Sequence, residues 1–359
     1  MAGWVLSSLG SQSASAVPAL TRALKDPKPE VRAMAALALS KIGTNATKPA
    51  IPALIESLKD SNPAVRESAA NALIEFGADA KDAIPSLLAV LKMPGDEDSE
   101  EILPRRSASR ALSVIGPDAA PDLIPLLGSE DKVLQSLTAE TLGRMGRDII
   151  PQLREVLSSE SPHARWRAAF LLGRSGSEAS ETIPDLKKHL EDPDPLVRAR
   201  SAEAVWKITQ EADAVLPVHV ASLKNDADGV ALVSIIALKD MGTAAKPVMP
   251  EIIEALKGGE KDVRVQAATI LGTLWRTESE AVPILIEALE DKDPDVRRAT
   301  VIALGSIGSG ATAAVPILKK MNDDEVNIYV RREAGKAARN IESGRQGTPA
   351  KGGARRKNQ

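Results

Sequence analysis

Residues that could carry out chemistry are few in this 359-residue chain. It has no cysteine, which excludes disulfides, thiolate metal ligands and cysteine nucleophiles. Its three histidines, His163, His189 and His219, belong to no H-E-x-x-H motif, and neither a G-x-S-x-G nor a phosphate-binding G-x-x-x-x-G-K-[ST] motif occurs. We expect each histidine to lie on a polar helix face or in a loop. The sequence therefore predicts no catalytic residue, no metal site and no cofactor.

Two acidic clusters could attract a cation or a basic partner. Asp291, Asp293 and Asp295 alternate as in a calcium loop, but no glycine or distal glutamate completes the loop. We interpret Asp291 as a turn residue and Asp293 as a helix cap. The acidic stretch 96–101 is interpreted as a solvated loop.

Composition narrows the fold class. Aromatic residues make up only 2% of the chain against 43% hydrophobic residues, which argues against a large β-sheet core. No apolar run reaches 18 residues, so we expect no membrane partner. The first six residues lack the basic region and long apolar stretch of a secretory signal, which leaves a cytoplasmic location as the default. The class predicted is all-α.

Internal repetition is the strongest signal in the sequence. Ten prolines recur at near-constant distances, eight of them preceded by Ala, Ile or Val and followed two residues later by Leu, and the last five intervals between them are each 33 residues. The third repeat holds a six-residue insertion. We number repeats 1 to 10 by these prolines: Pro18, Pro52, Pro85, Pro121, Pro151, Pro184, Pro217, Pro250, Pro283 and Pro316.

Each repeat is predicted to fold as two helices. In repeat 2, residues 51–58 have apolar positions with the helical period, and Asn62-Pro63 reads as a cap and first turn of a second helix that ends at Gly77. Alanines on the second helix permit close helix packing. Three landmarks recur at fixed distances from the proline. They are Asp at +8 (Asp26, Asp60, Asp192, Asp291, Asp324), Arg at +14 (Arg32, Arg66, Arg165, Arg198, Arg264, Arg297, with Arg105 after the insertion and Arg331 one residue late) and Gly at +25 (Gly43, Gly77, Gly146, Gly176, Gly242, Gly308).

This pattern of Pro, Asp and Val-Arg resembles the HEAT repeat, and the short period is similar to the bacterial HEAT-like group that includes phycobilisome lyases. The resemblance implies an α-solenoid, or armadillo-like superhelix, of about ten tandem two-helix repeats. It also implies a ladder in which Asp and Arg bond along the stack. Departures predict interruptions near repeats 4 and 7, where Ser129, Ser159, Asn225 and Gly258 replace Asp, and Gln135 and Ala231 replace Arg.

A candidate partner-binding patch lies on the second helices. The resemblance places positions +15, +19 and +22 on the concave groove. There, repeats 5 to 7 supply aromatic and apolar residues beside arginines, a combination enriched at interface hot spots. The alternative is that these side chains pack between repeats. The patch comprises Trp166, Phe170, Trp206, Arg167, Arg174, Arg200, Leu232 and Ile236.

The two ends of the chain differ from the array. Gly10 has the position of a terminal repeat glycine, so residues 4–9 read as the end of a second helix; either a half-repeat cap or a fragment of a longer array explains this. We therefore assign residues 1–342 to an array that starts inside a repeat. Residues 343–359 are expected to form a disordered basic tail with five positive charges, which leaves −8 on the remainder of a chain whose net charge is −3.

The function predicted is a non-catalytic scaffold that binds a peptide, helix or protein surface in the concave groove. Two alternatives stay open. One is a bilin lyase or lyase subunit, implied by the resemblance alone. The other is nucleic-acid contact through the tail 343–359, because the acidic body argues against a nucleic-acid groove.

Overall fold

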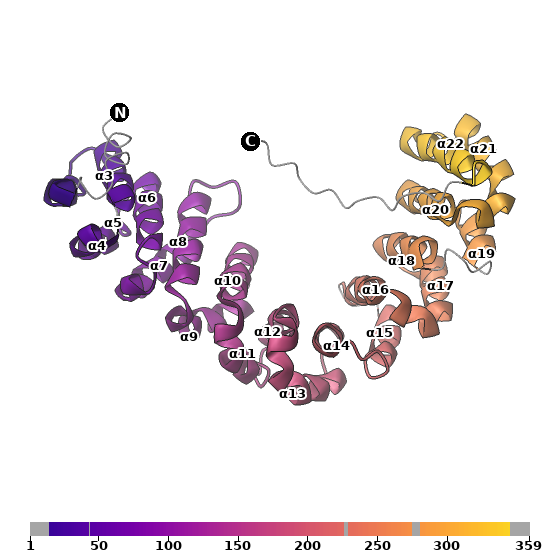
Figure 1. Cartoon of the computed structure of the whole chain (residues 1–359), viewed down its shortest axis with the longest axis horizontal. Coiled ribbons are helices and arrows are strands. Elements are labelled where there is room, and N and C mark those ends of the chain that lie inside the picture. The colour runs from indigo at the N-terminus through magenta and orange to yellow at the C-terminus, as the bar shows by residue number, and fades with distance from the viewer. Residues whose placement is uncertain (1–13, 43, 226–228, 275–280, 345–359) are drawn as a thin grey trace. The chain divides into compact units, whose positions relative to one another are not determined.

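A computed structural model describes residues 14–42, 44–225, 229–274 and 281–344, and Figure 1 shows these residues as helices joined by short connections. Within these ranges no strand occurs. The chain divides into two compact parts, an N-terminal part that ends at Leu186 and a C-terminal part that begins at Lys187. The all-α prediction is confirmed.

Ten helix pairs follow the ten prolines, as the repeat spacing predicts. The first helices are α2 (Val17–Ala23), α5 (Ile51–Ser57), α7 (Ile84–Leu91), α9 (Ala120–Leu123), α11 (Ile150–Val156), α13 (Ile183–Lys188), α15 (Leu216–Leu223), α17 (Met249–Gly258), α19 (Ala281–Ala288) and α21 (Val315–Asp324). The second helices are α3 (Pro29–Ile42), α6 (Pro63–Ile74), α8 (Ile102–Ile115), α10 (Lys132–Met145), α12 (Pro162–Arg174), α14 (Pro195–Thr209), α16 (Val230–Met241), α18 (Lys261–Leu274), α20 (Pro294–Ile307) and α22 (Ile328–Glu342).

Short connections join one repeat to the next. Residues 210–215 join α14 to α15 without a helical turn. The other described connections contain α4 (Thr44–Thr47) or 3-10 turns: η2 (Lys48–Ala50), η3 (Gly77–Ala83), η4 (Pro117–Ala119), η6 (Gly146–Ile149), η7 (Gly176–Thr182), η9 (Gly242–Val248) and η10 (Gly308–Ala314). Two further 3-10 turns, η5 (Ile124–Gly128) and η8 (His189–Glu191), extend first helices.

The second helices of each part pack in chain order, with the first helices covering one side (Figure 1). Leucines from both helices of a repeat fill the space between these layers; Leu54, Leu73, Leu87 and Leu112 are fully buried. Because each pair presents one apolar side to its neighbour, the repeats form an α-solenoid by stacking instead of by enclosing one central core.

Helix starts follow the capping signals in the sequence. The Asn62 side chain accepts a hydrogen bond from the backbone N–H of Ala64, and Asp194 and Asp293 cap α14 and α20 in the same way, each before a proline in the first turn. The predicted cap role of Asp293 is therefore confirmed.

Glycines end the second helices with backbone angles that side chains resist. At Gly242 the backbone has φ 60° and ψ −131°, and at Gly308 φ 73° and ψ −137°. The positive φ is one that favours glycine, whereas ψ lies far from the left-handed helical value of about +47°. The chain therefore leaves each of these helices through the glycine and turns directly into a 3-10 segment.

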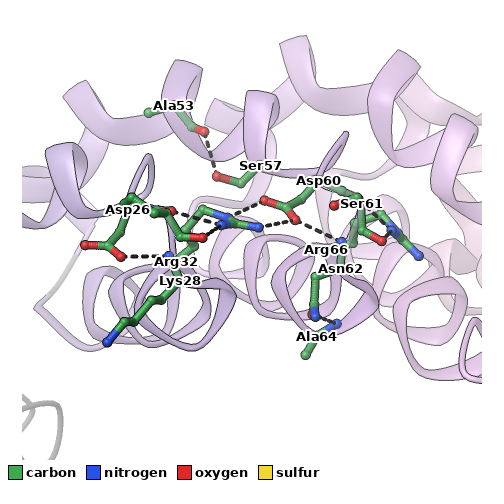
Figure 2. Close-up of polar contacts among 11 residues, drawn as sticks. Asp26, Lys28, Arg32, Ala53, Ser57, Asp60, Ser61, Asn62, Ala64 and Arg66 are labelled. Atoms are coloured by element: carbon green, nitrogen blue, oxygen red, sulfur yellow. Dashed lines mark hydrogen bonds and ion pairs between the residues drawn. The ribbon is translucent and has the colours of Figure 1, made fainter.

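An arginine at the start of the second helix links each of several repeats to the next. Arg32 donates through Nη1 to the backbone carbonyl of Asp26 in its own turn, and through Nε to the Asp60 carboxylate of the next repeat at 2.6 Å (Figure 2). That carboxylate also accepts the Asn62 N–H. The bonds from Arg32 lower the pKa of Asp60 below its ordinary value.

We call such an inter-repeat bond a rung. Arg264 to Asp291 repeats it at 2.8 Å, as the resemblance implies. Three other rungs use acids that the spacing did not predict: Arg66 bonds Glu101, Arg105 bonds Asp131 at 2.9 Å, and Arg297 bonds Glu325 at 2.8 Å.

Near repeat 4 the predicted interruption is replaced by other polar bonds. Gln135 donates to the carbonyl of Ser129, and its side-chain oxygen accepts a bond from Arg167 of repeat 5. At repeats 7 and 8 no rung can form, because neither Ala231 nor Gly258 carries a polar side chain.

One stretch, Pro294–Asp324, is long and apolar enough to be tested as a membrane span. It consists of three separate elements, α20, η10 and α21, with a positive backbone φ at Gly308 where α20 ends, and 56% of the most apolar window is buried inside the protein. Trp4, Gly10, Gly43, Trp275 and the tail residues 345–359 lie outside the described residues, so the predictions on the two ends stay predictions.

Helices α18 and α20 approach each other closely at Gly272 of α18. A Cβ built on Gly272 would lie 2.3 Å from both Cα and Cβ of Ala303 on α20. We predict that Gly272→Ala lowers the free energy of unfolding by about 1–3 kcal/mol, as overpacking of a core does. Urea unfolding followed by circular dichroism measures this. Gly258→Ala is the control, since a Cβ there meets nothing within 4 Å, and equal losses in both variants would contradict the packing described.

Glu325, not Asp324, is the acid of the last described rung, and this assignment is testable. Hydrogen bonds from Arg297 lower the pKa of Glu325, so the carboxylate contributes stability above the unfolded glutamate pKa of about 4.3 that is lost as the pH falls through its lower folded pKa. We expect Glu325→Gln to cost about 1 kcal/mol at pH 7 and to flatten the stability profile below pH 5. Thermal unfolding between pH 3 and 7 measures both effects; Asp324→Asn, the neighbouring exposed acid, should change neither, and the reverse outcome would refute the assignment.

Candidate functional site

Four of the eight predicted patch residues lie on α12, in the N-terminal part. The Trp166 and Phe170 side chains are half-buried and one helical turn apart, so they share a face. The Arg167 guanidinium lies 4.2 Å from the centre of the Trp166 ring, and that of Arg174 lies 6.0 Å from the Phe170 ring. Both distances fall within the range of cation–π attraction. The aromatic and cationic residues that the sequence analysis singled out are thus in contact on this helix.

Arg167 also has a structural task. It is only 9% exposed, and besides Trp166 it contacts Gln135 of α10 through a hydrogen bond. Burial lowers the pKa of Arg167, although a guanidinium stays protonated in proteins. Arg167 therefore fixes the Trp166 ring and joins two repeats at once.

A cleft of about 310 Å³ lies between α8 and α10, the second helices of repeats 3 and 4. Arg106 and Arg110 of α8 line it opposite Ser136 and Glu140 of α10. Arg144, which also lines the cleft, bonds Glu140 at 2.6 Å. The sequence analysis missed these arginines, although Arg106 and Arg110 occupy positions +15 and +19 of repeat 3 once the insertion is removed.

The other four patch residues lie in the C-terminal part and differ in exposure. On α14, Trp206 is only 9% exposed, and Arg200 donates to Glu203 at 2.7 Å. On α16, Leu232 is half-buried and Ile236 is exposed. The structure therefore brings the eight residues into two groups of four, each within its own part of the chain.

Glu203 has the same position in repeat 6, 19 residues after the proline, as Phe170 has in repeat 5, but it has a different role. Burial disfavours its charge, yet hydrogen bonds from Lys207 and Arg200 hold its pKa below the ordinary value. The carboxylate thus engages the cations beside Trp206 within the protein.

The three histidines lie in different environments. His163 is exposed, and its Nδ1 accepts a bond from Trp166 Nε1 at 3.4 Å. His189 contacts Asp192 at 3.0 Å. His219 was expected on a polar face or in a loop, and that expectation is wrong: it is fully buried on α15, where Nδ1 contacts Ser234 Oγ at 3.2 Å and burial lowers its pKa to about 4. A single polar neighbour on the next helix, which sequence spacing does not reveal, accommodates the ring.

The acidic clusters are used in the architecture. Asp291 accepts both Arg264 and the N–H of Asp293, which confirms its predicted turn role. Glu101, expected in a solvated loop, instead bonds Arg66. Among the residues in ranges 14–42, 44–225, 229–274 and 281–344, no group of three His, Asp or Glu side chains is placed to hold a metal ion.

Solved structures similar to this chain include complexes of Kap95 and Kap121p. The Kap95:Nup1 complex matches with a TM-score of 0.57 and 14% identity over 91% of this chain and 51% of that chain. Kap121p bound to Pho4p matches with a TM-score of 0.55 and 12% identity, over 92% of this chain and 46% of that chain. Kap95p bound to RanGDP matches with a TM-score of 0.53 and 15% identity, over 91% of this chain and 52% of that chain. The chain therefore spans about half the length of these proteins, and at such identities the likeness shows the fold alone.

Searching the curated proteins gave no match. The similarity to phycobilisome lyases and the nucleic-acid contact of the tail accordingly stay predictions. The family model described as HEAT repeats matches residues 1–51, 46–103, 150–239 and 249–339, which is most of the sequence. With ten stacked helix pairs and arginine rungs between them, the chain belongs to the HEAT repeat family.

Proposed function

We propose that this protein is a non-catalytic scaffold that binds a peptide, helix or protein surface on the second-helix face of its N-terminal part. The observation that carries the proposal is the α12 cluster, in which Trp166 and Phe170 are partly exposed and each ring is in contact with an arginine. Tryptophan, tyrosine and arginine dominate the binding energy of protein interfaces. Rings held by neighbouring guanidinium groups lose little conformational freedom when a partner covers them.

Unpaired cations on the same face favour a partner with acidic residues. The side chains of Arg106 and Arg110 are exposed and form no ion pair with the residues that the structure describes. Arg174 is exposed as well and contacts the Phe170 ring. Since opposite charges across an interface speed association and select partners, a carboxylate-bearing segment is the best complement to this face.

The C-terminal group contributes less to the proposed surface. Trp206 is buried and Arg200 is engaged by Glu203, so these two residues support the packing alternative. Ile236 is exposed and Leu232 half-buried, which leaves α16 as a smaller apolar contact.

Two kinds of support come from outside the site. The fold is a repeat array, an architecture whose extended surfaces serve binding in many proteins. The karyopherins with similar folds are described in complexes, Kap95 with Nup1 and Kap121p with Pho4p. Fold does not determine function, so the weight of the proposal lies on the α12 cluster.

The test is a paired measurement of binding and stability. A partner captured by the wild-type protein is identified, and its dissociation constant is measured by calorimetry for the wild type and for Trp166→Ala/Phe170→Ala. We expect the double variant to bind at least about tenfold more weakly, because hot-spot truncations cost 2 kcal/mol or more.

Tyr329→Ala is the matched control, since it removes an aromatic side chain that is 67% exposed on α22. It should leave the affinity unchanged. Unaltered binding by the α12 double variant, or a lowered melting temperature as its only effect, would show that Trp166 and Phe170 pack between repeats and do not bind the partner.

A further inference from the structure

Helix α8 carries an exposed row of side chains in which apolar residues flank two arginines. Leu103, Arg106, Arg110 and Val114 follow one another at intervals of three, four and four residues, so they lie on one face of the helix. Leu103 is 53% exposed and Val114 is 48% exposed. We call these four residues the α8 row. Because large apolar side chains gain by being covered and arginines by being paired, the α8 row is a candidate contact surface.

A groove runs beside the α8 row. The cleft of about 310 Å³ lies between α8 and α10, with Arg106 and Arg110 in its α8 wall. Two small side chains, Ser109 and Ser136, also line it, and α8 packs less extensively on α10 than on α6. Side chains of a partner therefore find room between α8 and α10, next to the arginines.

Charged residues in the groove differ in whether they are paired within the protein. Arg144 and Glu140 of α10 bond each other at 2.6 Å. Arg106 and Arg110 form no ion pair with any described residue, and Glu97, which precedes α8 and is exposed, is the remaining acid in the described lining. The groove thus offers a ligand two free guanidinium groups against one carboxylate.

We propose that the groove between α8 and α10 binds an acidic amphipathic helix of a partner protein. Two glutamates of that helix, one turn apart, pair with Arg106 and Arg110, whose planar groups bond carboxylates. Apolar residues before and after the glutamates cover Leu103 and Val114. The spacing matches the α8 row, since residues three or four apart share one side of any α-helix. This inference rests on the proposed scaffold function and names the chemistry of its partner.

A nucleic acid fits the same groove less well. Phosphates recur at every nucleotide, whereas Glu97 and Glu140 stand beside the arginines and repel a continuous negative charge. The exposed apolar side chains Leu103 and Val114 at the two ends also have no complement in a phosphate backbone. A helix, by contrast, places single carboxylates opposite single cations.

The experiment uses the full chain and a synthetic alanine-based helical peptide. One face of the peptide carries leucine, glutamate, glutamate and leucine at the spacing of the α8 row, and the control peptide has glutamines in place of the glutamates. Affinities are measured by fluorescence anisotropy at low and at physiological salt. We expect the glutamate peptide to bind at least about tenfold more tightly than the glutamine peptide at low salt, because two ion pairs of the strength measured at exposed sites add up to such a factor.

Added salt should shrink this difference, since ions screen exposed charges. Equal affinities of the two peptides, an affinity for the glutamate peptide that salt does not change, or no binding of either peptide would overturn the proposal. Tighter binding of a single-stranded oligonucleotide than of the glutamate peptide at physiological salt would overturn it as well.

Two double variants locate the site. Arg106→Gln/Arg110→Gln should weaken the glutamate peptide at least about tenfold and leave the affinity for the glutamine peptide unchanged. Arg332→Gln/Arg339→Gln is the matched control, since it removes the same charge from two exposed arginines of α22, and it should bind as the wild type does. All four side chains are exposed, so both variants should melt as the wild type does. Equal losses of affinity in the two variants would show attraction to positive charge in general and contradict the site.

Two further variants separate this proposal from the scaffold proposal. Leu103→Ala/Val114→Ala should weaken both peptides alike, and unchanged affinities would refute the apolar contacts. Trp166→Ala/Phe170→Ala leaves the α8 row intact and should bind the glutamate peptide as the wild type does. Unaltered partner binding in that variant counts against the α12 cluster, whereas a loss of peptide affinity there equal to that of Arg106→Gln/Arg110→Gln contradicts the groove assigned here.

Discussion

Arginine at the start of the second helix is the group on which the order of the repeats depends. Its guanidinium joins two turns at once: it donates to a backbone carbonyl of the turn before its own helix and to the acid at the corresponding turn of the next repeat. Alanine and glycine on the second helices let these turns come close enough for the bond, as the contact of Gly272 with Ala303 shows. Small residues thus set the helix spacing, and the arginine fixes the register at that spacing.

The molecule differs from a uniform array at the repeats where the rung arginine or its acid is replaced by another residue. At repeat 4, Gln135 and Arg167 form an alternative link, and Arg167 at the same time supports the Trp166 ring of the proposed binding face. At repeats 7 and 8 the link is absent and a cleft takes its place. The α12 cluster, to which we assign binding, thus adjoins a departure from the repeat pattern, in agreement with the general observation that function departs from local structural rules.

Much of the fold could be predicted from the sequence, because a fixed period in prolines, caps and glycines reports local structure directly. The acids of the rungs could not: Glu101, Asp131 and Glu325 replace the expected partners, since a guanidinium bonds whichever carboxylate lies within reach in space. The burial of His219 escaped prediction for a related reason, whereas that of Trp206 agrees with the packing alternative. Position on a helix gives the direction of a side chain but not the neighbours that cover it. Arg106 and Arg110 were overlooked although their register follows from that of Arg105.

Hydrogen exchange of the backbone amides tests most directly whether the arginine rungs hold neighbouring repeats together. Within the C-terminal part, two junctions have a rung, from Arg264 and from Arg297, and the junction between α16 and α18 has none. The account predicts that amides of α15 and α16 exchange through openings of lower free energy than amides of α18 and α20. Equal protection on both sides of that junction, or earlier opening of α18 and α20, would contradict it.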